Sequence, residues 1–116
     1  MSETPKVLVH HRDVHIGAHL LESIEQRCAM LAHEFSEASR FELTFENKGM
    51  SVRGLAHATG RRTDVSTHAE ASEPGIVVDR VFDKIERQLR RVHDKRIFGR
   101  RRSAQRAALK KRQPEE

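Results

Sequence analysis

The sequence predicts an α+β protein, a two-layer β-α-β-β-β-α sandwich in which a four-stranded sheet carries two helices on one face. Apolar residues recur at helical spacing in two separate segments of the chain. Between those segments, apolar and polar residues alternate in consecutive short stretches separated by turn signals. Each pattern leaves one apolar face, and the helices and the sheet bury these faces against each other.

The first two elements are a strand and a helix. Residues 6–11 (KVLVHH) are short and rich in β-branched side chains, which is typical of a strand. Residues 17–35 then follow a helical period, with Gly17 as the expected N-cap. The apolar stripe of this helix consists of Leu20, Leu21, Ile24, Cys28, Leu31 and Phe35. Because Cys28 lies on this stripe, we expect a buried structural thiol.

Three strands are expected next. Residues 39–47 alternate, and Phe41, Leu43 and Phe45 share one face. After a turn at residues 47–49, residues 51–59 form a strand of small side chains, and residues 63–71 alternate again. Gly54, Ala56 and Ala58 lie on one face of the strand over residues 51–59, and their small size would let a helix lie close to it.

The second helix is expected to begin at Pro74 and to end near residue 96. Its apolar stripe is opposed by a row of basic residues: Arg80, Lys84, Arg87, Arg91 and Lys95. This row is either an ordinary solvated face, with Asp83 pairing with Arg87 at helical spacing, or a binding surface.

Charge is distributed very unevenly along the chain. Residues 84–112 contain thirteen basic and two acidic residues, a net charge of +11, whereas the whole chain of 116 residues carries +5. Residues 1–83 carry a net charge of −4. A near-neutral body with one cationic end is suited to a polyanion, of which nucleic acid is the commonest.

We expect one folded domain over residues 1–97 and a basic segment over residues 98–116. The second segment has no core-forming period, so it is expected to be disordered on its own or to form a fraying helix. It could also serve only as a solubility appendage.

Several classes of protein are not expected. No apolar run is long enough to span a membrane, and residues 1–5 contain no apolar signal region. The single cysteine excludes an internal disulfide and fits a reducing, cytoplasmic compartment. We find no activated nucleophile, no phosphate-binding glycine loop and no metal-ligand spacing among the eight histidines, so we expect no enzyme, cofactor, metal or small-molecule substrate.

Two segments carry a family resemblance. Residues 78–89 (VDRVFDKIERQL) are similar to the second helix of the short ribosome hibernation-promoting factors, the family that includes ribosome-associated inhibitor A. Arg27, Leu31 and Phe35 fall at that family's spacing in the first helix. The resemblance covers roughly residues 6–97. It implies the family's fold, which looks like a double-stranded-RNA-binding domain.

The resemblance also implies a function. Members of this family bind the small ribosomal subunit where messenger and transfer RNA bind, and they silence ribosomes in starved cells. The partners implied are the small subunit and its ribosomal RNA, with the free protein a monomer. Arg27, Lys84 and Arg87 match the family's RNA-contacting positions, and Arg90, Arg91 and Lys95 continue that helix end. The remaining candidates follow from the run of positive charge: Arg96, Arg100, Arg101 and Arg102.

Two departures and two alternatives accompany the resemblance. The family's aromatic residue at the entry to the second helix is missing from Glu73-Pro74-Gly75, and Ser23 stands where the family often has tyrosine.

The first alternative is a general RNA-binding or RNA-chaperone module that acts through the basic segment. The second is a protein-interaction domain that uses an exposed sheet face with Arg40, Glu42 and Glu46.

Overall fold

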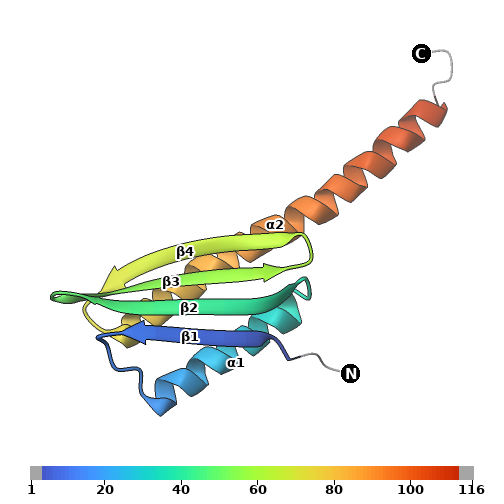
Figure 1. Ribbon diagram of the computed structural model, residues 1–116. Coiled ribbons are helices and arrows are strands. Elements are labelled where there is room, and N and C mark those ends of the chain that lie inside the picture. Colours follow the sequence, from blue (N-terminus) through green and yellow to red (C-terminus); the bar gives the residue numbers. More distant parts are fainter. Residues whose placement is uncertain (1–3, 113–116) are drawn as a thin grey trace.

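The computed structural model describes residues 4–112, with side chains described for residues 4–95. Six elements follow one another along the chain in the predicted order (Figure 1). They are β1 (Lys6–Arg12), α1 (Ala18–Glu34), β2 (Ala38–Lys48), β3 (Ser51–Gly60), β4 (Thr63–Ala71) and α2 (Pro74–Arg112). The predicted fold class is therefore confirmed.

The four strands form one mixed sheet in the order β1-β2-β3-β4. β1 pairs in parallel with β2, whereas the β2–β3 and β3–β4 pairs are antiparallel. A parallel pair needs a crossover connection, and α1 supplies it. The antiparallel strands follow each other through tight turns, and Gly49, with φ of 76°, occupies the first of these.

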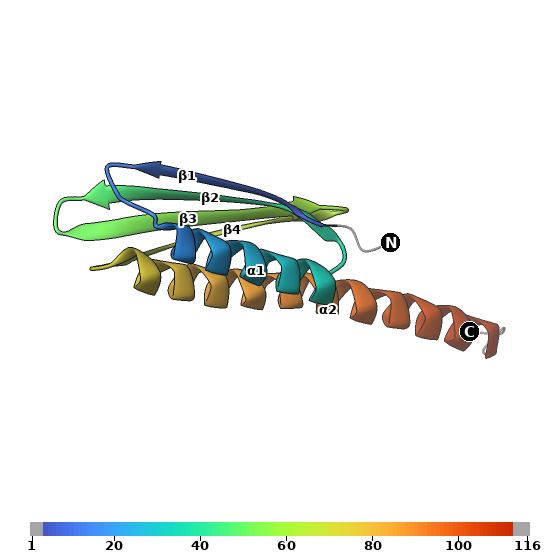
Figure 2. The ribbon, with the colours of Figure 1, turned by 90° about the horizontal axis from the view of Figure 1, so that it is seen from below.

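Both helices cover the same face of the sheet (Figure 2). The predicted stripes of the helices and of β2 meet between the two layers. Ile24 and Cys28 from α1, Phe45 from β2 and Val81 from α2 have no exposed surface, and Leu43 and Ile85 are 1% exposed. Burial of this continuous apolar layer, at about 25 cal/mol per Å², is the main force holding the fold together.

α2 lies very close to the middle of the sheet because β3 presents small residues there. A Cβ atom added to Gly54 would lie 2.4 Å from Cγ1 of Val77 in α2 and 3.2 Å from the ring of Phe45. Ala56 and Ala58 on the same face are buried. The expectation that a helix packs closely on this face of β3 is confirmed.

α2 is longer than the sequence pattern predicted. We expected the helix to end near residue 96, but its backbone stays helical through Arg112, and this part extends beyond the sheet (Figure 1). One glycine at position 99 costs a helix only about 1 kcal/mol, and residues 103–111 consist mostly of strong helix formers. Of the two expectations for this segment, disorder or a continuing helix, the helical backbone through Arg112 agrees with the second. The division into a domain over residues 1–97 and a separate segment over residues 98–116 stays a prediction.

No helix in the described part of the chain is both long enough and apolar enough to cross a membrane.

Candidate nucleic-acid interface

α2 presents two polar surfaces in addition to the apolar one that packs on the sheet. The first is the basic row predicted from the sequence, which we call the basic stripe: Arg80, Lys84, Arg87, Arg91 and Lys95. The second is an acidic row formed by Asp79, Asp83 and Glu86, which lines a groove against α1. The two surfaces run side by side along the helix.

The first two residues of the basic stripe hold the edge strand β4. Nζ of Lys84 donates a hydrogen bond to the backbone carbonyl of His68 at 2.9 Å. The guanidinium of Arg80 donates to the backbone carbonyl of Glu70 at 2.7 Å. Lys84, a predicted RNA contact, therefore also has a structural role that the sequence did not reveal. An ammonium group has three donors, so two remain for a ligand.

The other three residues of the stripe are also exposed. A guanidinium nitrogen of Arg87 lies 3.0 Å from a carboxylate oxygen of Asp83. This is the ion pair at helical spacing that the sequence predicts if the stripe is an ordinary solvated face. Arg91 and Lys95 are exposed. Among the residues whose side chains are described, neither forms an ion pair. These two cations are therefore exposed and have no carboxylate partner among the described side chains.

Arg27 of α1 lines the groove between the helices, and Arg90 of α2 contacts two of the carboxylates that line it. This groove has a volume of about 600 Å³, and its lining includes Met30, Glu34 and Phe82. Arg27 pairs with Asp79 at 2.5 Å, and Arg90 pairs with Glu34 at 2.6 Å and with Glu86 at 3.6 Å. The predicted RNA-contacting arginines are thus divided between two surfaces.

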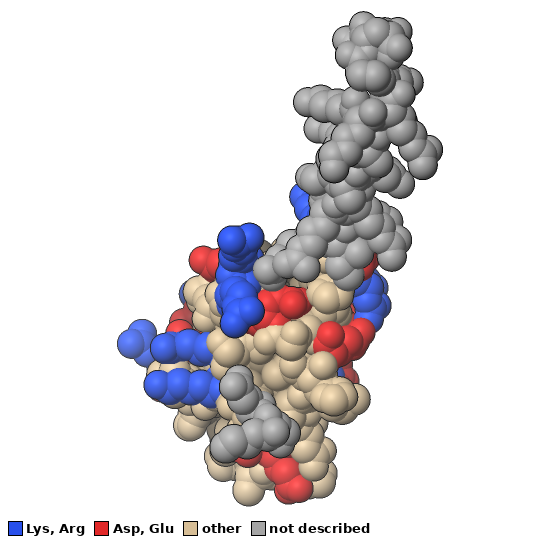
Figure 3. Space-filling model, turned by 90° about the vertical axis from the view of Figure 1, so that its right-hand side faces the viewer, with Lys and Arg blue, Asp and Glu red and all other residues tan. Residues whose placement is uncertain are grey.

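The structure describes the backbone but not the side chains at the remaining predicted positions. Arg96, Arg100, Arg101 and Arg102 all lie on the helical backbone of α2, beyond the residues whose side chains are described. Their roles as RNA contacts stay predictions. In Figure 3, described basic and acidic side chains occur close together on one end of the molecule.

One histidine connects the two helices. Nδ1 of His93 lies 2.9 Å from a carboxylate oxygen of Glu37, and the rings of His93 and Phe35 meet edge to face. Glu37 is largely buried, with 15% of its side chain exposed. His93 therefore joins the end of α1 to α2. Among the described residues, no three histidine, cysteine or acidic side chains gather as a metal site.

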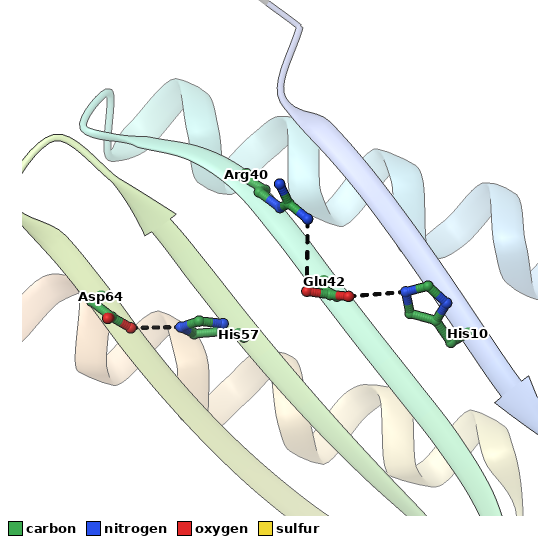
Figure 4. A network of polar contacts seen from close by, with 5 residues as sticks. All are labelled: His10, Arg40, Glu42, His57 and Asp64. Atoms are coloured by element: carbon green, nitrogen blue, oxygen red, sulfur yellow. Dashed lines mark hydrogen bonds and ion pairs between the residues drawn. The ribbon is translucent and has the colours of Figure 1, made fainter.

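The outer face of the sheet is polar, and much of its charge is paired (Figure 4). Glu42 lies 2.9 Å from a ring nitrogen of His10 and 3.9 Å from the guanidinium of Arg40. His57 pairs with Asp64 at 2.5 Å. Because acids and bases alternate here, this face does not form a cationic surface for a polyanion.

Cys28 is buried as expected, and its environment suppresses its reactivity. Burial, with a smaller contribution from the negative charge of Glu25, raises the pKa of the Cys28 thiol from 9.0 to about 12. A rise of this size lowers the thiolate fraction at pH 8 about a thousandfold. We expect maleimide to label the folded protein at least that much more slowly than the protein in denaturant, as followed by mass spectrometry. Rapid labelling of the folded protein would contradict the burial of Cys28.

Comparisons with known proteins agree with this fold. The model of the family described as Sigma 54 modulation protein / S30EA ribosomal protein matches residues 7–97. No curated protein matches the chain significantly.

Two solved structures share the architecture. A ribosomal subunit interface protein from Coxiella burnetii has a TM-score of 0.67 and 21% identity, covering 78% of this chain and 99% of its own. The N-terminal domain of Thermus thermophilus Protein Y has a TM-score of 0.67 and 17% identity, covering 76% of this chain and 98% of its own. At these identities the two structures show a common fold, while the family model covers most of the chain. The chain therefore belongs to the ribosome-associated Sigma 54 modulation protein / S30EA ribosomal protein family, as the resemblance of residues 78–89 indicated.

Proposed function

We propose that this protein binds the small ribosomal subunit in the channel for messenger and transfer RNA and blocks translation in starved cells. The observation that carries the proposal is the continuity of α2. A single helix holds Arg91 and Lys95 of the basic stripe and continues to Arg112 through eight further basic residues without an acidic one. Such a helix suits a surface rich in phosphates.

Inhibition on this model needs no chemical step. Cations of the basic stripe and of the continuing helix bind phosphates of structured ribosomal RNA, while the sandwich occupies the space that other RNA molecules need. Arg27 and Arg90 can contact RNA phosphates only if their ion pairs with Asp79, Glu34 and Glu86 break. The protein acts as a cytoplasmic monomer and requires no cofactor.

A general RNA-binding module remains the second candidate. It is favoured by the charge of residues 98–112, which comprise seven basic residues and no acidic one. A cationic segment of this kind binds any RNA at low salt, without regard to shape. The two candidates therefore differ in whether binding needs the shape of the subunit.

Sucrose-gradient cosedimentation at moderate salt separates the two candidates. The full-length chain is mixed with purified small subunits or with an equal mass of naked structured RNA. We expect saturable, one-to-one comigration with the subunit and little with naked RNA. Equal and salt-sensitive binding to both would instead support the general RNA-binding module.

A second arm of the experiment tests inhibition itself. The protein is added to small subunits before messenger RNA and initiator transfer RNA, and the bound transfer RNA is measured. We expect transfer-RNA binding to fall in proportion to the occupied subunits. Undiminished transfer-RNA binding on saturated subunits would rule out the proposed channel.

A further inference from the structure

Three of the arginines that we expect to contact RNA are already bound to carboxylates. The distances are 2.5 Å for Arg27–Asp79, 3.0 Å for Arg87–Asp83 and 2.6 Å for Arg90–Glu34. Glu86 lies 3.6 Å from Arg90 as a second partner. Two of these pairs join residues more than fifty positions apart in the sequence.

Two of the arginines are also held by aromatic rings. The guanidinium carbon of Arg27 lies 5.7 Å from the ring centroid of Phe82, and that of Arg90 lies 5.8 Å from the ring centroid of Phe35. The hydrogen bond that Arg90 donates to Glu34, together with the negative charge of Glu34, raises the pKa of Arg90 further. These contacts hold both guanidinium groups against the helices, while 39% of the Arg27 side chain and 50% of the Arg90 side chain stay exposed.

The paired groups together carry no positive charge. Three arginines and the four carboxylates of Glu34, Asp79, Asp83 and Glu86 sum to −1. A phosphate that approaches this surface must displace a carboxylate from its arginine and then remain close to that carboxylate. Donors such as ribose hydroxyls and base amino groups meet no such repulsion, because an ionised carboxylate accepts hydrogen bonds.

We propose that Glu34, Asp79, Asp83 and Glu86 determine which RNA the protein binds. They repel any RNA whose phosphates face these carboxylates instead of the basic stripe. The inference rests on the proposed function. A regular RNA duplex presents phosphates all along its length, so the four carboxylates weaken its binding. A shaped ribosomal site can direct phosphates to the basic stripe and ribose or base donors to the carboxylates. Selectivity then comes from penalising the wrong partner.

Isosteric amides test the proposal. The variant carries E34Q, D79N, D83N and E86Q, which keep the shape of each side chain and remove its charge. Exposed ion pairs contribute about two- to fivefold each, so we expect affinity for a 20-base-pair RNA duplex to rise roughly 10- to 100-fold. Because three arginines become free to contact phosphates, the slope of the logarithm of duplex affinity against the logarithm of salt concentration should become steeper by about three. Affinity for the small subunit should rise less than about threefold.

A second variant controls for the change in net charge. It carries E42Q, E46Q, D64N and E70Q on β2 and β4, which add the same charge on the outer face of the sheet. We expect this control to raise duplex affinity far less than the variant that carries E34Q, D79N, D83N and E86Q. Circular dichroism and thermal unfolding confirm that each variant is folded.

Three results would overturn the proposal. They are an unchanged duplex affinity, an equal gain in the control variant, and an equal gain for the duplex and the subunit. If the unmodified protein did not bind subunits at all, the proposed function would fail separately. The difference between the two variants on duplex RNA would then decide whether the groove carboxylates repel phosphates.

Discussion

Replacing Arg87, Arg91 and Lys95 with glutamate should lower the affinity for the small subunit by about a thousandfold. Each lost phosphate contact should cost about 1.4 kcal/mol, which is tenfold in affinity. In the basic stripe, these three residues follow Arg80 and Lys84, whose side chains hold β4. Lys84 is left unchanged because it holds the carbonyl of His68 in β4.

The measurement is a titration of labelled protein with small subunits at constant salt. The matched control reverses three exposed cations on the outer face of the sheet, Lys6, Arg12 and Arg40, and therefore changes the net charge equally. The register places Lys6 beside Arg40 and Arg12 beside Glu46, on the face opposite the helices. The stripe would not be the binding surface if both variants lost affinity equally or if neither did.

Replacing Gly60 with alanine should destabilise the fold by about 3 kcal/mol, a large part of the 5–15 kcal/mol typical of a domain. An added Cβ would lie 1.7 Å from the backbone oxygen of Glu37 and 3.0 Å from the backbone nitrogen of Ser39. These atoms belong to the backbone where β2 begins, and the Glu37 oxygen also accepts a hydrogen bond from Arg61 at 2.9 Å. Rotating a side chain cannot relieve this clash.

Denaturant unfolding followed by circular dichroism measures the loss. Gly75→Ala is the matched control, because a Cβ there would meet nothing within 4 Å. At that position in α2, alanine should stabilise the protein by up to about 1 kcal/mol. A Gly60→Ala variant that unfolds at the same denaturant concentration as the unmodified protein would contradict the close approach of Glu37.

Local patterns were enough to predict most of the fold. The periodicity of the apolar residues located both helices, and the small side chains on one face of β3 predicted that a helix could pack closely on it. The predicted end of α2 near residue 96 is wrong, because the apolar stripe stops there but the helix continues to Arg112. Alanine, leucine, arginine and lysine all favour helix, so a segment without an apolar stripe can still continue one.

The candidate site was less predictable because its contacts depend on how the two helices lie against each other. The Asp83–Arg87 pair could be expected, since helix geometry brings residues four positions apart together. No local pattern links Arg27 to Asp79, or Glu34 to Arg90. The bond from Lys84 to the carbonyl of His68 likewise requires knowledge of the distance between α2 and β4.

The hydrogen bonds from Arg80 and Lys84 to β4 have a consequence for how the protein behaves in concentrated solution. The outer carbonyls of an edge strand are a template on which a strand of another molecule can add, and such additions lead to aggregates and fibrils. Two of these carbonyls, on His68 and Glu70, are already occupied by cations of α2. Removing both cations should therefore make the protein prone to aggregate through β4, a failure that would resemble loss of ligand binding unless particle size were measured.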